Sequence, residues 1–188
     1  PSVITYNAAI SACEWQETLR LLGEMQAKGL TPDVITYNAA ISACEKNGET
    51  TISVGLMKSA LEAGLFEECF SSEGGLEKLD LHELPLDTAK AMIRDFLDIH
   101  HHHQQPKEAG QQEQEAKRQK RDIGLGRVVV IVTEKGNHIL ADGRRGVLQK
   151  EIRAFVEQEL QLEATLAANN PGALLVTVRR VDGNELCL

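Results

Sequence analysis

Two ionisable side chains, Asp80 and His82, alternate with two leucines in the sequence Leu79-Asp80-Leu81-His82. In an extended strand successive side chains point to opposite faces, so the polar pair would share one face and the leucines the other. A carboxylate beside an imidazole at the C-terminal end of a strand can transfer protons or hold a divalent metal ion. The same spacing also fits a solvent-facing polar pair without a chemical role, so both interpretations stay open at this point.

The composition indicates a globular chain of 188 residues, enough for one domain of usual size or two small ones. Aromatic residues make up only 4% of the chain, so its core must be built mainly from aliphatic side chains. The four cysteines lack C-x-x-C spacing and are expected to be reduced. No apolar run approaches the roughly 18 residues of a membrane span. Because the chain begins with Pro1 rather than Met, we expect a piece of a longer protein.

The formal net charge of −8 argues at first against a nucleic-acid partner, but the charge is unevenly distributed. Residues 1–78 carry five Lys and Arg against eleven Asp and Glu, whereas residues 107–153 carry eleven against seven. A phosphate backbone would be expected to lie along the second, locally basic region.

A segment of twelve residues, VITYNAAISACE, occurs at 3–14 and again, letter for letter, at 34–45. Each copy favours a short helix, and the residues after the first copy predict a second helix with one apolar stripe. That stripe consists of Trp15, Leu19, Leu22 and Met25. Gly29 is expected to end the second helix, and Thr31-Pro32-Asp33 to turn the chain into the next copy. The repeated unit is therefore predicted to be a helix–turn–helix that needs stacked partners.

These residues resemble the pentatricopeptide repeat (PPR) family, with VITYNAAISACE similar to its first helix and GEMQAKGLTPD to its second helix and exit loop. The resemblance implies a single-stranded RNA partner, with each repeat reading roughly one base. The family's base-selecting positions fall on Asn7 with Asp33, and on Asn38 in the second copy. The Asn–Asp combination is similar to the family's pyrimidine-preferring pair, most like uracil. The alternative is that Asn7 and Asn38 only support turns and helix starts.

The two copies depart from the family pattern in ways that predict weak RNA binding by this segment alone. The first copy runs from Glu14 directly into Trp15, about four residues short of the usual turn, so a continuous helix could form there. The second copy loses the family signature after Glu49, although residues 50–64 keep a helical pattern. About three or more repeats are normally needed for a stable array.

The pattern changes after the repeats and predicts an α+β protein: helical-hairpin repeats at 1–64, a linker at 65–77 and a sheet domain at 78–188. In the sheet domain we expect strands at 78–81, 127–133, 163–167 and 173–178, with helices at 86–99 and 146–160. This βαβαββ order predicts a two-layer α/β sandwich with a mixed four-stranded sheet. Residues 100–122, rich in Gln, His and charge, are expected to be a disordered insertion.

The sequence LDLHELP, the later TEKGNHI and the predicted βαβαββ order together resemble the small MutS-related (Smr) domain. The first matches the family's L-D-x-H motif, and residues 133–136 occupy its T-G-x-G motif. The resemblance implies phosphodiester cleavage with Asp80 and His82 as catalytic residues and a divalent cation, Mg2+ or Mn2+, held by Asp80. It also implies a nucleic-acid contact made by Thr133, Lys135, Gly136, His138, Arg144, Arg145 and Lys150.

One departure from the Smr pattern matters, since Glu134 occupies the first glycine of the T-G-x-G motif. Its Cβ would hinder a positive φ, and its carboxylate would repel a phosphate. Either Glu134 becomes a second metal ligand beside Asp80, or the turn has lost cleavage and the domain only binds; we favour the second.

The combined resemblance implies an RNA-binding PPR–Smr protein of organellar RNA processing, located in a plastid or mitochondrion. Its repeats would recognise single-stranded RNA that the Smr domain binds or cleaves. The alternatives are a metal-dependent nuclease that nicks DNA and a catalytically inactive adaptor that contacts RNA or protein. DNA therefore stays open as a partner, no membrane is expected, and the oligomeric state is not fixed by the sequence.

Overall fold

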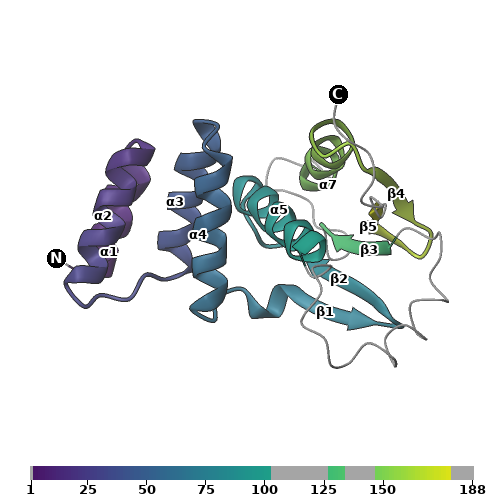
Figure 1. Ribbon diagram of the computed structural model, residues 1–188, viewed down its shortest axis with the longest axis horizontal. Coiled ribbons are helices and arrows are strands. Elements are labelled where there is room, and N and C mark those ends of the chain that lie inside the picture. The colour runs from purple at the N-terminus through teal and green to yellow at the C-terminus, as the bar shows by residue number, and fades with distance from the viewer. Residues whose placement is uncertain (1, 103–126, 134–146, 179–188) are drawn as a thin grey trace, which may run out of the picture. The chain divides into compact units, whose positions relative to one another are not determined.

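The computed structural model describes residues 2–102, 127–133 and 147–178 (Figure 1). In these ranges helical repeats precede a sheet domain, so the protein is α+β, as the sequence predicts. The helices are α1 (Val3–Ala12), α2 (Trp15–Ala27), α3 (Val34–Lys46), α4 (Thr50–Glu62), η1 (Glu67–Cys69), α5 (Leu86–His102), α7 (Val147–Ala154) and η2 (Phe155–Glu159). The strands are β1 (Phe70–Glu73), β2 (Leu76–Asp80), β3 (Arg127–Val132), β4 (Glu163–Ala167) and β5 (Asn170–Val178). None of the described helices is both long and apolar enough to cross a bilayer.

The described residues divide into two compact units that do not follow the chain in simple order. The helical unit takes in residues up to 70 and, after an interruption, residues 83–101, which include α5. The sheet unit takes in residues 71–82 and the described residues from 102 onward. The predicted boundary near residue 78 placed α5 with the sheet, whereas its contacts place it with the repeats.

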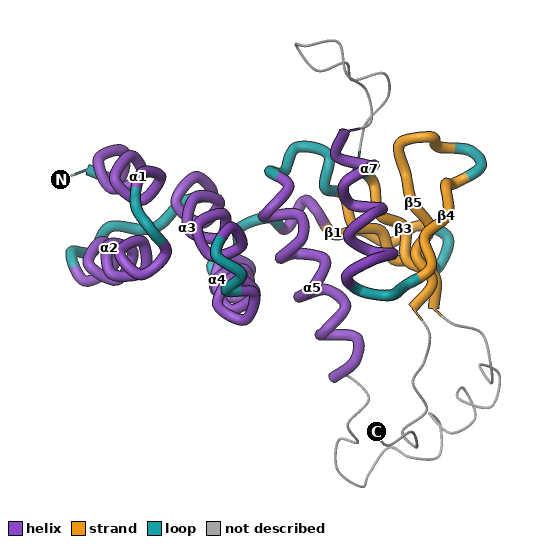
Figure 2. The backbone as a smooth tube through the Cα atoms, turned by 90° about the horizontal axis from the view of Figure 1, so that it is seen from above, coloured by secondary structure: helices purple, strands orange, loops and turns teal. Residues whose placement is uncertain are grey.

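The helical unit is built from two helical hairpins, α1–α2 and α3–α4, which Figure 2 shows nearly along their axes. In the first hairpin α1 ends at Ala12 and α2 begins at Trp15. The two residues between them, Cys13 and Glu14, are both extended, with ψ near 160°. The continuous helix that the shortened turn allowed therefore does not form, and the hairpin is kept.

Both hairpins end in the same way, although only the first carries the family signature. Gly29 and Gly64 have φ of +73° and +77°, the left-handed conformation that glycine adopts without steric cost. The next residue then folds back: Leu30 N–H donates to the Met25 carbonyl at 3.1 Å, and Leu65 N–H to the Ala60 carbonyl at 3.0 Å. The second copy has thus lost the repeat's sequence but not its structure.

The core of the first hairpin lies along the predicted stripe. Met25 is fully buried and packs with Tyr6 and Ile10 of α1. Leu22 is also buried, and Thr18 shares this face, where its hydroxyl donates to the Ile10 carbonyl. This packing holds α1 and α2 together despite their short turn.

The sheet unit contains five strands in the order β1-β2-β3-β5-β4, one more than the sequence predicted. The extra strand, β1, lies in the segment predicted to be a linker. Gly74 and Gly75 both have positive φ, which forms a two-residue turn of the kind that joins antiparallel strands. This turn pairs residues 70–73 with β2, and the predicted number of strands is corrected.

The remaining pairings match a mixed sheet, with β2 parallel to β3 and β5 antiparallel to both β3 and β4. Ile131, Leu174 and Val176 are buried, and α7 packs on β5. The predicted helix at 146–160 ends at Ala154 and continues as one wider turn, η2. The central strand and its partners thus hold the end of β2, where Asp80 lies.

Candidate nucleic-acid interface

Asp80 and His82 lie side by side at the carboxyl end of β2. The Asp80 Oδ1 and His82 Nδ1 atoms are 2.6 Å apart, and the His82 backbone N–H also donates to the same carboxylate oxygen at 3.3 Å. Leu79 and Leu81 are fully buried, while both polar side chains are partly exposed. The alternation predicted from the sequence is therefore found, and an oriented carboxylate–imidazole pair results.

The end of the neighbouring strand, β3, is held to β5 by Thr133. This residue is buried, and both its backbone N–H and its hydroxyl donate to the Gly172 carbonyl, at 2.9 and 3.0 Å. Both of its donor groups are thus used in holding β3 to β5. Lys150 is exposed on α7. The other predicted contacts lie outside the described residues: Glu134, Lys135, Gly136, His138, Arg144 and Arg145.

The described residues do not themselves form a metal site. Across residues 2–102, 127–133 and 147–178, no three His, Cys, Asp or Glu side chains gather as a metal ion would require. Asp80 and His82 alone do not complete a ligand set for Mg2+, which prefers several oxygen ligands. Because Glu134 lies outside these ranges, the predicted Asp80–Glu134 metal site stays a prediction.

In the helical unit, Asp33 starts the second hairpin and orders the junction between the repeats. Its carboxylate accepts the Thr36 backbone N–H at 2.9 Å, while the Thr36 hydroxyl accepts the Asp33 backbone N–H at 3.1 Å. This reciprocal arrangement satisfies two donors at the start of α3. Burial raises the pKa of Asp33, but the hydrogen bonds from Thr36 and Asn7 outweigh it and lower the pKa below its usual value. Asp33 is therefore an anionic acceptor at neutral pH.

Asn7 reaches across from α1 to the same cluster. Its amide nitrogen lies 3.1 and 3.4 Å from the two Asp33 carboxylate oxygens, and its amide oxygen accepts the Thr36 hydroxyl at 2.6 Å. Asn7 is buried, with 8% of its surface exposed. The structure thus brings together the two residues that the PPR resemblance paired, and Asn7 supports the start of α3. Whether the pair also reads a base stays a prediction.

Asn38, the counterpart of Asn7 in the second copy, is held by a residue far along the chain. Its amide oxygen accepts the Thr88 hydroxyl of α5 at 2.9 Å. Asn38 is half-buried, so part of it still reaches the surface. These two residues are 50 positions apart, and no motif in the sequence connects them.

Residues 1–46 match the PPR repeat family. The match covers the first hairpin and α3, the stretch that contains Asn7, Asp33 and Asn38. It supports RNA binding by this part of the chain, because base recognition in such modules depends on polar side chains presented at repeat junctions. No curated protein matches the chain. The sheet unit lies outside the PPR match, so its likeness to the Smr domain stays a prediction.

Two exposed apolar residues, which the sequence analysis missed, lie near the predicted base-selecting residues Asn7 and Asn38. Ile4 is 79% exposed and Ile35 is 62% exposed, although both are large aliphatic side chains. Each precedes its asparagine, Asn7 or Asn38, by three residues and therefore lies on the same helix face. Both copies place this isoleucine identically, and that repetition is the signal that could have identified it.

Proposed function

We propose that this chain is an RNA-binding PPR protein whose helical repeats hold single-stranded RNA at their junctions. The observation that carries the proposal is the Asn7–Asp33–Thr36 cluster, in which a side chain from each of two successive repeats meets at one point. An exposed isoleucine beside the cluster supplies an apolar surface for the face of a base. Proteins hold unpaired bases by hydrogen bonds to the polar edge of the base and by apolar contact with its flat face.

The chemistry of Asp33 favours a base that offers an N–H on its Watson–Crick edge. A carboxylate accepts hydrogen bonds and donates none. Uracil presents an N–H between two carbonyls, whereas cytosine presents an unprotonated ring nitrogen at the same place. The first junction should therefore prefer uracil to cytosine.

Binding of labelled RNA oligonucleotides to the full chain tests this proposal. Uracil-rich RNA should bind better than cytosine-rich RNA, and Asp33→Asn, which replaces an acceptor by a group that can donate, should reduce or reverse that preference. Gln26→Ala, an exposed change on α2, is the control and should leave binding unchanged. Absence of RNA binding, or an unaltered preference in Asp33→Asn, would contradict the proposal.

For the sheet unit, we propose that it binds or cleaves the same RNA in organellar RNA processing. The Asp80–His82 pair supports an acid–base role, because the carboxylate oxygen lies 2.6 Å from Nδ1 and orients the imidazole ring. A divalent cation, Mg2+ or Mn2+, belongs to the proposal through Asp80 and Glu134. Given the substitution at Glu134, binding without cleavage is the form we favour.

Incubation of labelled RNA and DNA with the full chain, with Mg2+ or Mn2+ present, distinguishes cleavage of RNA from binding without cleavage. RNA cleavage that Asp80→Asn abolishes would support a nuclease, whereas RNA binding without cleavage would support an adaptor. DNA nicking without RNA affinity would contradict the RNA-binding proposal. The plastid or mitochondrial location is tested separately by a fluorescent fusion of the complete reading frame.

A further inference from the structure

Helix α5 begins in the same way as the two repeat helices α1 and α3. In each helix the fourth residue donates its backbone N–H to the carbonyl of the residue that precedes the helix. The bonds are Tyr6 to Ser2 at 3.1 Å, Tyr37 to Asp33 at 3.1 Å and Ala89 to Pro85 at 2.9 Å. This bond is the ordinary first bond of an α-helix and also opens α2 (Thr18 to Glu14) and α4 (Ser53 to Glu49), so it only gives the helices a common numbering. The residue types at the numbered positions then relate α5, which lies outside the PPR match, to α1 and α3.

The alignment places the same residue types at two positions of each helix. The third residue of each helix is threonine (Thr5, Thr36, Thr88), and the eighth is isoleucine (Ile10, Ile41, Ile93). All three isoleucines are fully buried. Thr36 and Thr88, which each have a repeat in front of them, are also fully buried.

The two buried threonines make the same contact. Thr36 donates its hydroxyl to the Asn7 amide oxygen at 2.6 Å, and Thr88 donates its hydroxyl to the Asn38 amide oxygen at 2.9 Å. Asn7 and Asn38 are equivalent in the duplicated segment. The hydrogen bond that joins the first repeat to the second is therefore reproduced between the second repeat and α5.

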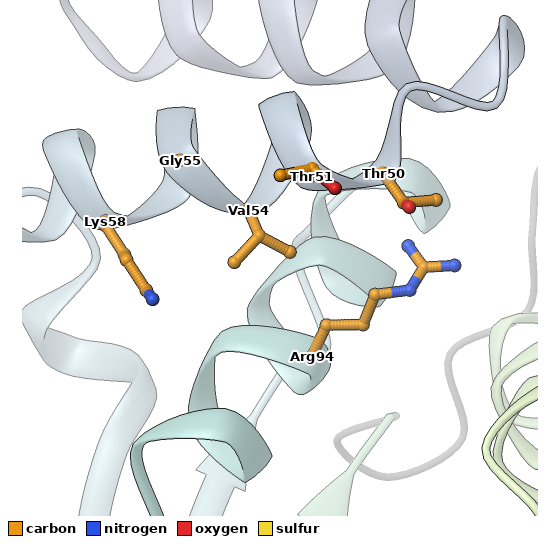
Figure 3. A pocket seen from close by; sticks show the side chains of 6 residues that line it. All are labelled: Thr50, Thr51, Val54, Gly55, Lys58 and Arg94. Carbon is orange, nitrogen blue, oxygen red and sulfur yellow. The ribbon is translucent and has the colours of Figure 1, made fainter. Parts of the chain in front are cut away.

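Two further polar contacts hold α5 on the same face of α3. Ser42 donates its hydroxyl to Asp87 at 2.5 Å, and the Arg94 guanidinium lies 2.7 Å from each carboxylate oxygen of Glu45. Figure 3 shows Arg94 extending from α5 beside the start of α4, at one end of a hollow of about 380 Å³. The contacts spread over two turns of α5, so the helix is seated along its length.

We propose that α5 serves as the first helix of a third repeat and that Thr88, acting through Asn38, sets the base preference of a second RNA position. This inference rests on the RNA-binding function proposed above and deepens it. Thr88 is a positioning residue, because it orients the Asn38 amide and does not itself meet the base.

The protein groups expected to meet the second RNA position differ from those at the first in whether they accept or donate hydrogen bonds. At the first junction the residue before the helix is Asp33, whose carboxylate lies within hydrogen-bond distance of the Asn7 amide nitrogen. At the second it is Pro85, which has no polar side chain, and no group in the described ranges accepts from the Asn38 amide nitrogen. With its oxygen held by Thr88, Asn38 offers donors. The second position therefore selects a base whose Watson–Crick ring nitrogen is an acceptor, N3 of cytosine or N1 of adenine, whereas the first selects a ring N–H.

The test uses the full chain with Thr88→Val, which removes the hydroxyl while keeping a branched side chain. Thr88→Ser restores the hydroxyl, and Thr5→Val is the matched control at the equivalent exposed position of α1. In the free protein, the side-chain amide signal of Asn38 in a ¹H–¹⁵N spectrum should move in Thr88→Val, return in Thr88→Ser and stay in Thr5→Val. If the chemical shift of the Asn38 side-chain amide is unchanged in Thr88→Val, the inference is overturned, while the proposal of RNA binding still stands.

Binding is then measured with RNA oligonucleotides varied at one position at a time. Thr88→Val should weaken base discrimination about fivefold at one nucleotide, as loss of one hydrogen bond predicts, and Asp33→Asn should change a different nucleotide. Unchanged discrimination in Thr88→Val, or both variants changing the same nucleotide, overturns the inference while RNA binding stands. No RNA binding by the unmodified chain overturns both proposals. If Thr88→Val does not fold, Thr88→Ala replaces it, with a moved Asn38 signal and weakened discrimination at that nucleotide as the supporting result.

Discussion

Two stretches with the same twelve residues, 3–14 and 34–45, adopt different structures at their ends. In the first copy α1 ends at Ala12, whereas in the second α3 continues to Lys46. The first copy is followed at once by Trp15, which starts the next helix, and the second by a glycine turn at Gly48 with φ of +76°. Identical sequence thus forms the same helix, but the residues that follow decide where it stops.

The environment of the two copies differs as much as their ends. Cys44 is fully buried and its counterpart Cys13 only half-buried, while Thr36 is fully buried and Thr5 exposed. Within the described ranges α3 has α1 on one side and α5 on the other, whereas α1 has α3 on one side only. A repeat residue therefore gains its interactions from its neighbours rather than from its own sequence.

The largest effect should come from the core of the more enclosed copy. Ile41→Ala leaves a cavity in a helix packed on both sides and should lower the free energy of unfolding by about 3–5 kcal/mol, at the upper end of the range for such truncations. Ile10→Ala, at the equivalent position, should cost about 2–3 kcal/mol because α1 can relax on its open side. Denaturant unfolding followed by the fluorescence of Trp15, the single tryptophan, measures both. Equal costs would contradict the comparison.

A smaller effect separates the equivalent glutamates. The Glu45 side chain is buried in its pair with Arg94, whereas Glu14 is exposed. Glu45→Ala should therefore destabilise the helical unit by about 2 kcal/mol, since it removes hydrogen bonds to a charged group. Glu14→Ala should stay within about 0.5 kcal/mol, as surface substitutions usually do. The same unfolding experiment applies, and a matching loss in both variants would show that α5 does not anchor through Glu45.

The helix starts should differ in their response to pH. Asp33→Ala and Ser2→Ala each remove a capping side chain, at a cost of about 1 kcal/mol. Because the pKa of Asp33 is lowered in the folded state, its contribution is present above the ordinary value of 3.8 and is lost as the pH falls through the lower, folded-state pKa. The cost of Asp33→Ala should therefore shrink in acid, while that of Ser2→Ala stays constant. Thermal unfolding of both variants from pH 7 to pH 2 tests this.

The smallest expected effect is chemical. Burial, together with Glu49 and Glu45, raises the pKa of the Cys44 thiol to about 11, so little thiolate forms at neutral pH. Cys13 should react with iodoacetamide in the folded protein, and Cys44 only after unfolding. Peptide mapping by mass spectrometry distinguishes the two sites, and early labelling of Cys44 would mean that α3 is not enclosed.

Helix ends, strand alternation and the duplication could be predicted from the sequence, because each depends on residues that are close together in the chain. The duplicated segment, the helix end at Gly29 and the alternation around Asp80 and His82 all follow from backbone preferences and from the periods of helix and strand. The extra strand was missed because Phe70–Glu73 carries no alternating pattern of its own. It is specified instead by the two glycines that fold it onto β2.

The sequence by itself determined the repeats and the α+β class, since a fixed offset and local periodicity carry that information, and the PPR resemblance paired Asn7 with Asp33. Only the tertiary structure decided that α5 joins the helical unit and that Thr88 meets Asn38. A hydrogen bond between residues 50 positions apart leaves no mark on either local pattern. It exists because stacking on α3 brings the start of α5 to the place where a third repeat would begin.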